Sequence, residues 1–261
     1  MILVAIFLGI VQALTEFLPI SSSAHLLILP WLLGFTNPGL AFDAALHIGT
    51  SVALLWYFGG DFIAILRERG KLLWYILLAS IPGGAVGFFG EKVIDKIFHE
   101  GTAAIAISAC GMIVATLIIW YLDTHARQLK PIDKLTRRDA ILIGIGQALA
   151  LIPGVSRSGS TIAAGLAIGL KREEAARFSF LIGTPIALGA GLYKFIGVVS
   201  AQPSSSELLQ MSVGIFISGL GGFLVIRWLL AYLKGHDLRV FIWYRLAFAL
   251  LVLVALGAGI R

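Results

Sequence analysis

Long apolar segments separated by short polar ones make up most of this chain. Six of them cover residues 40–59, 72–90, 103–122, 177–199, 210–233 and 240–260. Each is close to the ~20 residues that an α-helix needs to cross the hydrocarbon core of a bilayer. The pattern therefore predicts an all-α, polytopic membrane protein with six transmembrane helices.

Two further apolar regions, residues 1–33 and 138–170, are interrupted by polar residues near their middle. Glu16 and Ser21–Ser23 interrupt the first region, and the run 153–161 interrupts the second. Non-helical backbone is tolerated at membrane depth only where protein or a water-filled cavity covers it. We therefore expect two re-entrant helical hairpins whose polar turns are buried inside the protein.

The two halves of the chain repeat each other in sequence. A shift of 135 residues places Gly9 on Gly144, Gln12 on Gln147, Ser21 on Ser156 and Ser23 on Ser158, and a shift of 134 places Ile48-Gly49-Thr50 on Ile182-Gly183-Thr184. Each half has one hairpin and three spans, and an odd number of crossings inverts the second half in the membrane. We predict a single membrane domain, residues 1–261, made of two inverted-topology repeats at about 1–122 and 138–261. Such folds have their sites near the bilayer midplane, where the two polar turns would face each other.

The composition agrees with a membrane protein. Hydrophobic residues make up 59% of the 261 residues and charged residues only 13%, with a mean hydropathy of +0.95. A soluble domain of this length would contain more charged residues. The net charge of +6 comes from residues spread among short loops instead of one stripe, which argues against nucleic-acid binding. The single cysteine, Cys110, excludes an intramolecular disulfide.

The basic residues predict the orientation of the chain. Most of them lie in the loops at 60–71, 123–139, 171–177 and 234–239. The opposite side has only Lys92, Lys96 and Arg261. The positive-inside rule therefore places the four basic loops in the cytoplasm and both termini outside, so that the first hairpin enters from outside. Residues 91–100 are expected to form a short amphipathic helix along the outer interface.

The second polar turn has the composition of an anion site. An arginine near the middle of a membrane costs roughly 2.5–3.5 kcal/mol, so Arg157 is expected to face a polar cavity and an anionic partner. Ser156, Ser158 and Thr161 supply hydroxyl donors there, and Gly154 allows the backbone to approach a ligand closely. These residues favour a phosphate site. A purely structural salt bridge between Arg157 and Glu16 is the alternative.

The two turns also resemble a known family. The run Gln12-Ala-Leu-Thr-Glu16-Phe-Leu-Pro-Ile-Ser-Ser-Ser-Ala-His25, together with Pro153-Gly-Val-Ser-Arg-Ser-Gly-Ser-Thr161, closely resembles the two signatures of the bacitracin-resistance type of undecaprenyl-diphosphate phosphatase. The resemblance extends over the whole chain. It implies an enzyme of the bacterial cytoplasmic membrane that releases the terminal phosphate of undecaprenyl diphosphate, recycles this lipid carrier for peptidoglycan synthesis and confers bacitracin resistance. The active site is then expected to open to the periplasmic side.

The resemblance implies catalytic roles for four residues. Arg157 would bind the diphosphate and stabilise the charge that develops on the transferred phosphoryl group. Ser22 is the candidate nucleophile and His25 its base, or the acid for the leaving group. Glu16 would orient His25 or hold a divalent cation, Mg²⁺ or Ca²⁺. Direct attack by water, activated by His25 or Glu16, would use the same residues.

Further residues are predicted to bind phosphate: Gln12, Ser21, Gly154, Ser156, Ser158 and Thr161. Many relatives have glutamate where this chain has Gln12, so Glu16 is the only carboxylate of the first signature. Asp43 and His47 lie four residues apart on one helix face and are expected to pair locally or to line the site.

The main alternative function is a polyprenyl-phosphate flippase or a secondary transporter, because inverted repeats with re-entrant hairpins are common in transporters. Such a protein needs an anion site but no serine–histidine pair beside it, so the pair favours an enzyme. An ion channel is disfavoured, since neither a ring of like charges nor a pore-lining carbonyl motif is present. The expected partners are the lipid substrate and the bilayer, and the pattern leaves a homodimer open.

Overall fold

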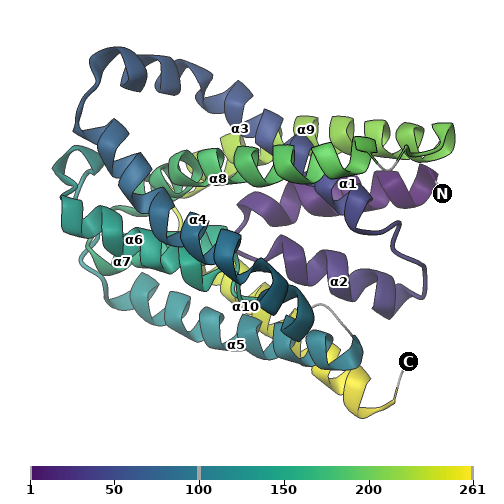
Figure 1. The fold of residues 1–261 in the computed structure, drawn as a ribbon. Coiled ribbons are helices and arrows are strands. Elements are labelled where there is room, and N and C mark those ends of the chain that lie inside the picture. Colours follow the sequence, from purple (N-terminus) through teal and green to yellow (C-terminus); the bar gives the residue numbers. More distant parts are fainter. Residues whose placement is uncertain (1, 99–100, 201, 260–261) are drawn as a thin grey trace.

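The computed structural model describes residues 2–98, 101–200 and 202–259, and most of them are helical (Figure 1). The helices are α1 (Ile2–Phe17), α2 (Ser22–Leu33), α3 (Leu40–Glu68), α4 (Lys71–Phe98), α5 (Gly101–His125), η1 (Ile132–Lys134, a 3-10 turn), α6 (Arg137–Leu149), α7 (Arg157–Ala167), α8 (Arg172–Ser200), α9 (Ser205–Tyr232) and α10 (Arg239–Gly257). Six of these, α3, α4, α5, α8, α9 and α10, are long and apolar enough to cross a membrane. The all-α class and the six predicted spans are confirmed.

Several helices are longer than the spans that predict them. α3 continues to Glu68 and α4 begins at Lys71, so the expected loop at 60–71 is almost entirely helical. Charged residues end an apolar span, but arginine, glutamate and lysine are good helix formers, and α3 therefore continues past the apolar region. The helix ends at Glu68, and the next residue, Arg69, adopts a left-handed conformation with φ of 46°. The separate interfacial helix expected at 91–100 is also wrong where the structure describes it, because α4 runs unbroken to Phe98; residues 99 and 100 lie outside the described residues.

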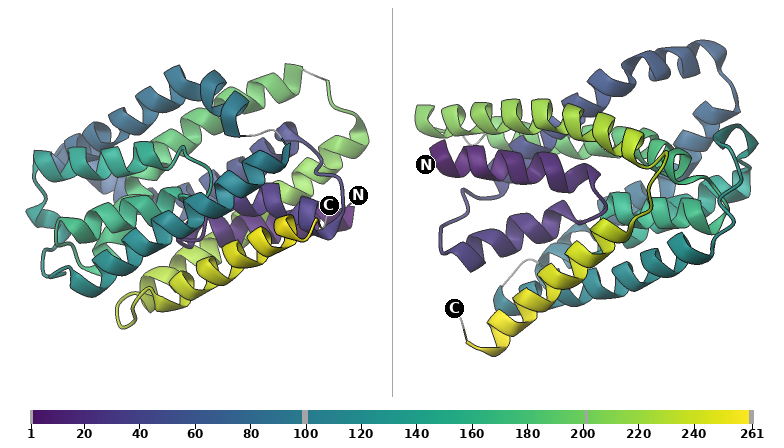
Figure 2. Two further views of the ribbon diagram at one scale, coloured as in Figure 1. Left: turned by 90° about the horizontal axis from the view of Figure 1, so that it is seen from below. Right: turned by 180° about the vertical axis from the view of Figure 1, so that it is seen from behind.

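The helices α1 and α2 form one hairpin, and α6 and α7 form another. The α1–α2 pair extends from the end of the molecule where α1 begins and α10 ends, and the α6–α7 pair extends from the opposite end (Figure 1, Figure 2). Their turns meet between the two ends, since Ser158 Oγ donates a 3.0 Å hydrogen bond to the carbonyl oxygen of Leu18. The arrangement agrees with the expected hairpins, whose re-entrant course in a bilayer stays a prediction.

The two turns adopt the same unusual backbone conformation. Ser21 and Ser156 precede α2 and α7 with φ values of 78° and 76°. Positive φ is uncommon for residues other than glycine. Each hydroxyl lies close to that of the serine two residues later, at 3.3 Å for Ser21 and Ser23 and 3.2 Å for Ser156 and Ser158. These matches support the predicted duplication, because the same residues repeat in sequence and in conformation.

Helix packing follows the same pairing. α1 packs on α9 as α6 packs on α4, and α9 and α4 also contact α3 and α8, respectively. α5 packs on α10. The order of elements and these contacts agree with two repeats, but the inverted-repeat organisation itself stays a prediction.

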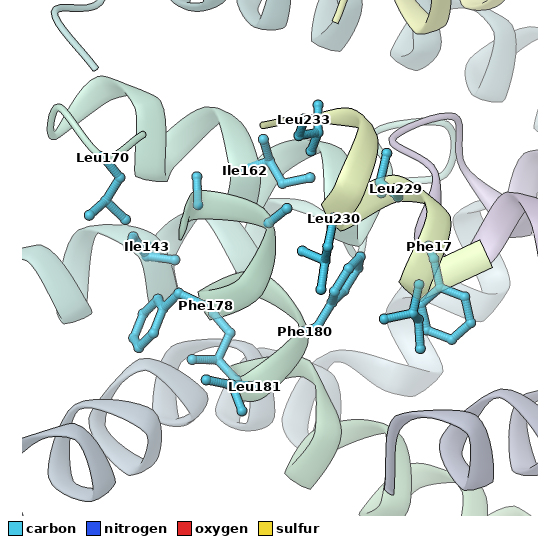
Figure 3. Packing of buried hydrophobic residues seen from close by; sticks show 14 of the residues in the cluster. Phe17, Ile143, Ile162, Leu170, Phe178, Phe180, Leu181, Leu229, Leu230 and Leu233 are labelled. Carbon is cyan, nitrogen blue, oxygen red and sulfur yellow. The ribbon is translucent and has the colours of Figure 1, made fainter. Parts of the chain in front are cut away.

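The largest buried cluster fixes the end of α1. Phe17, the last residue of α1, packs edge-on against Phe180 of α8, with the ring centroids 5.6 Å apart. Phe178 and Leu229 belong to the same cluster (Figure 3). Since all four side chains are fully buried, the first polar turn begins from a rigid position.

Candidate active site

Glu16 lies at the centre of a polar cluster formed by α1, α2, α3 and α7. Its Oε1 accepts a 2.8 Å hydrogen bond from Arg157 Nη2. Its Oε2 accepts hydrogen bonds from Ser22 Oγ at 2.7 Å and from Gln12 Nε2 at 3.2 Å. His47 Nδ1 lies 3.6 Å from the same oxygen. The structure thus brings together three of the four predicted catalytic residues.

Local helix geometry explains this convergence. Gln12 and Glu16 are four residues apart, so their side chains lie on one face of α1. Ser22 and Arg157 are the first residues of α2 and α7 and are themselves 135 positions apart. The repeat therefore places a hydroxyl and a guanidinium at equivalent points on the two sides of one carboxylate.

Arg157 has one nitrogen paired and one free. Its side chain is 18% exposed and its Nη2 is bound to Glu16. Nη1 is buried and has no hydrogen-bond partner within the part of the chain that the structure describes. An unsatisfied buried donor costs about 1–3 kcal/mol, which an incoming anion would recover. The predicted alternative, a salt bridge with Glu16, is therefore present, and it leaves one terminal nitrogen of the guanidinium without a hydrogen-bond partner among the described residues.

A glycine of α8 makes room for this guanidinium. Nη1 of Arg157 lies so close to Gly183 that a Cβ atom built there would overlap it. The requirement for glycine comes from this contact, because Gly183 lies within regular helix. The small residue sets the position of the free nitrogen.

His25 and Ser22 have different hydrogen-bond partners in the structure, so the predicted catalytic pairing of the two residues is not seen in this arrangement and stays a prediction. The His25 ring is buried, with Nδ1 2.7 Å from the carbonyl oxygen of Ser21 and Nε2 2.7 Å from the Tyr244 hydroxyl. The carbonyl can only accept, so Nδ1 carries the hydrogen and Nε2 accepts from the tyrosine. The ring also stacks on Phe248, with centroids 4.5 Å apart. His25 faces α10, whereas Ser22 faces α1, and the histidine has no lone pair left for the serine.

The serines of the two turns are bonded to protein. Ser156 Oγ caps α7 by accepting the N–H of Gly159 at 3.1 Å. Ser158 is 1% exposed and donates to the Leu18 carbonyl, and Ser21 is also 1% exposed. Phosphate binding by Ser21, Ser156 and Ser158 stays a prediction, since in this structure these hydroxyls shape the turns.

Thr161 and Gly154 have contacts that the sequence did not predict. Thr161 Oγ1 lies 2.5 Å from Ser179 Oγ, and the threonine is fully buried between α7 and α8. Gly154 has φ of +86°, and a Cβ atom there would overlap the Ser108 carbonyl oxygen. The close approach that this glycine permits in the structure is to the backbone of α5, which is a reason for glycine that the sequence did not predict. Phosphate binding by Thr161 and Gly154 stays a prediction.

Comparison with known proteins agrees with this geometry. A family model described as "Bacitracin resistance protein BacA" matches residues 5–251. The chain belongs to this family. An undecaprenyl-diphosphatase of Caldicellulosiruptor bescii is 44% identical over 95% of each chain. Proteins of the same name from Thermomicrobium roseum and Pelotomaculum thermopropionicum are each 41% identical, over 97% of this chain and 97% and 96% of the relatives.

In this BacA-family chain, two further residues lie near the turns: His47, which was expected to pair locally or to line the site, and Arg245, which was not singled out from the sequence. His47 Nδ1 accepts a 3.0 Å hydrogen bond from Gln12 Nε2, and its side chain is 40% exposed, so it forms part of the accessible wall of the site. Arg245 lies fully buried beneath both turns. The sequence could have indicated Arg245, since an arginine within an apolar span requires polar partners as Arg157 does.

The predicted cation has little support from the side chains of this family member. Among the described residues, no three histidine, cysteine, aspartate or glutamate side chains gather as they would around a metal ion. Glu16 is the only carboxylate of the cluster, and protein donors occupy both of its oxygens. A Mg²⁺ or Ca²⁺ ion there would have to displace them, so the cation stays a prediction and no catalytic step below depends on it.

Proposed function

We propose that this chain hydrolyses undecaprenyl diphosphate to undecaprenyl phosphate and inorganic phosphate, and so returns the lipid carrier to peptidoglycan synthesis and confers bacitracin resistance. The names of its relatives support the substrate. The observation that carries the proposal is the Glu16 cluster, in which one carboxylate binds both a serine hydroxyl and an arginine.

In the proposed mechanism Arg157 binds the terminal phosphate. The guanidinium turns away from Glu16 and Gly183, and Nη2 and the unpaired Nη1 then donate to two phosphate oxygens, which its planar shape suits. The phosphate charge spreads over its oxygens in the transition state, so fixed positive charge there lowers the barrier. Arg157 thus contributes to both binding and catalysis.

Ser22 Oγ is the proposed nucleophile, and Glu16 is its base. Oγ forms a bond to the terminal phosphorus while its proton passes to Glu16 Oε2, 2.7 Å away. The bond from that phosphorus to the bridging oxygen breaks, and undecaprenyl phosphate leaves with the electron pair and takes up the proton from Glu16. Water then attacks the phosphoserine while Glu16 receives the water proton and passes it to Ser22 Oγ, so that inorganic phosphate leaves and the Ser22 hydroxyl is regenerated. Direct attack by water with Glu16 as base is the competing route.

His25 acts through the backbone in this scheme. Its Nδ1–H donates to the Ser21 carbonyl, and the Tyr244 hydroxyl holds the opposite side of the ring. Ser21 immediately precedes Ser22, so His25 fixes the start of α2 and the direction of the nucleophile. We propose a positioning role for His25.

The proposal includes access from the periplasmic side of the inner membrane and two inverted repeats. In support, α1 begins and α10 ends at one end of the molecule, and the connection between α3 and α4, with its basic residues, lies at the other (Figure 1). All residues of the proposed mechanism come from one chain, so a homodimer is not required for it.

A direct test measures phosphate release from undecaprenyl diphosphate by the purified chain in lipid nanodiscs. We expect multiple turnovers and an equimolar yield of undecaprenyl phosphate. Movement of intact undecaprenyl phosphate across liposomes, with no phosphate release from the diphosphate, would favour the flippase alternative and contradict the proposal.

A further inference from the structure

Arg245 of α10 is the largest fully buried side chain of the described residues, at 1% exposure. Among those residues no carboxylate pairs with it. Its partners are instead neutral oxygens: the Thr116 hydroxyl and the carbonyls of Met112, Pro19, Gly154 and Val155. A buried cation is costly, so such a complete set of acceptors indicates a specific task.

Two of these carbonyls come from equivalent points of the two polar turns. Nη1 donates to the Pro19 oxygen at 2.8 Å, and Nη2 donates to the Gly154 oxygen at 2.9 Å. Pro19 and Gly154 are 135 positions apart, which is the shift that aligns the turns in sequence. One planar guanidinium therefore binds the same carbonyl of both turns at once. A lysine, with a single point-like ammonium, cannot reproduce this geometry.

Arg245 alone binds equivalent carbonyls of both turns among the described residues. α5, which packs on α10, contains no arginine or lysine that could bind the turns in the same way. α5 contributes in another way, because Thr116 Oγ1 accepts from Arg245 Nε at 2.6 Å and orients the guanidinium. Arg245 is thus a single arginine that binds both turns, in addition to the direct hydrogen bond from Ser158 to the Leu18 carbonyl.

We infer that Arg245 is a positioning residue that fixes the separation of the two polar turns, and so holds Glu16 and Ser22 of the first against Arg157 of the second. It binds the turns only through backbone carbonyls, three residues before Ser22 and three residues before Arg157. The consequence for turnover rests on the proposed phosphatase function, whereas the consequence for the turns does not.

Hydrogen exchange and kinetics test this inference on Arg245→Lys and Arg245→Met, with Thr116→Val as a milder change that keeps the arginine. Arg239→Lys is the matched control, since Arg239 lies on the same helix and its side chain is 68% exposed. Mass spectrometry would follow amide exchange in peptides that cover residues 18–22 and 153–157.

We expect faster exchange in both turn peptides of Arg245→Lys, by about 10-fold or more, and unchanged exchange in α3 and α9. We also expect kcat to fall by about 10- to 100-fold while KM changes by less than about 3-fold, because the substrate-binding groups are present but misplaced. Thr116→Val should show the same pattern with smaller changes, and Arg239→Lys should match the wild type.

Faster exchange in one turn alone, equal loosening of every helix, or a lower unfolding temperature with normal kcat would each overturn the inference. The two proposals fail separately. If the wild type releases no phosphate, the proposed function fails, and the exchange of the two turns still decides the role of Arg245.

Discussion

The two polar turns share a backbone but differ in chemistry. Ser21 and Ser156 have nearly the same positive φ, and Arg245 binds the equivalent carbonyls of Pro19 and Gly154. The side chains that would react occur once each. Ser22 occupies the position of Arg157, and Glu16 occupies that of Leu151.

This difference shows how a duplicated scaffold can make an asymmetric site. The conserved backbone brings two helix starts to one point, and each then presents a different group to the two oxygens of Glu16. In the proposed mechanism the serine on one side is the nucleophile and the arginine on the other side binds the anion. Two copies of either turn would give only one of these functions.

Loss of the Ser22 hydroxyl, the reactive group of the first turn, should cause the largest of the expected losses of turnover. Ser22→Ala removes the proposed nucleophile, and we expect kcat for phosphate release to fall about 1,000-fold or more. Ser23→Ala is the control because Ser23 is exposed, and it should retain activity within about 3-fold. Near-normal turnover by Ser22→Ala would reduce Ser22 to a phosphate ligand.

Arg157→Lys tests the contribution of the second turn. Lysine keeps the charge but cannot offer two fixed nitrogens, so kcat should fall about 100- to 1,000-fold while the protein stays folded in the membrane. Arg177→Lys alters another arginine bound to a carboxylate, that of Asp61, away from the site, and should be nearly neutral. Unfolding of Arg157→Lys with normal turnover of the folded fraction would favour a purely structural salt bridge.

Gly183→Ala should displace the Arg157 guanidinium of the second turn without changing its chemistry, and so tests whether its position matters. The added Cβ overlaps Nη1, and we expect kcat to drop about 10-fold through misplacement of the guanidinium. Gly189→Ala, on the same helix with nothing within 4 Å of the new atom, is the matched control. Equal activity of the two variants would show that the position of Nη1 does not matter.

Thr161→Val should have the smallest effect on turnover. Its hydroxyl is bonded to Ser179 inside the protein, so we expect a loss of about 1 kcal/mol in the free energy of unfolding and activity within about 3-fold of wild type. Activity and denaturant unfolding would both be measured. A large rise in KM with unchanged stability would restore Thr161 as a phosphate ligand.

Much of this arrangement could be predicted from the sequence. The six spans followed from segment length, and the burial of Arg157 and Glu16 followed from the cost of charge in a membrane, whereas the roles of Ser22 and Glu16 came from the resemblance of the two turns to the family signatures. The ends of the helices could not be predicted, because the length of an apolar span reflects the thickness of the bilayer, and the helix can continue beyond it.

The hydrogen-bond partner of Ser22 and the contacts of Arg245 could be recognised only from the structure. Sequence spacing placed His25 one turn from Ser22, but spacing does not say which neighbour each side chain faces, and the two residues face different helices. Most partners of Arg245 are backbone carbonyls, and those of the two turns are 91 residues away at Gly154 and 226 residues away at Pro19. A sequence motif records side chains and cannot show such acceptors.

The stereochemistry at phosphorus tests the central claim most directly. The measurement uses a prenyl diphosphate whose terminal group is a thiophosphate made chiral with oxygen isotopes, and it determines the configuration of the released thiophosphate. Attack by Ser22 followed by attack of water inverts phosphorus twice, so the account predicts net retention. Net inversion would show a single displacement by water and would contradict Ser22 as the nucleophile.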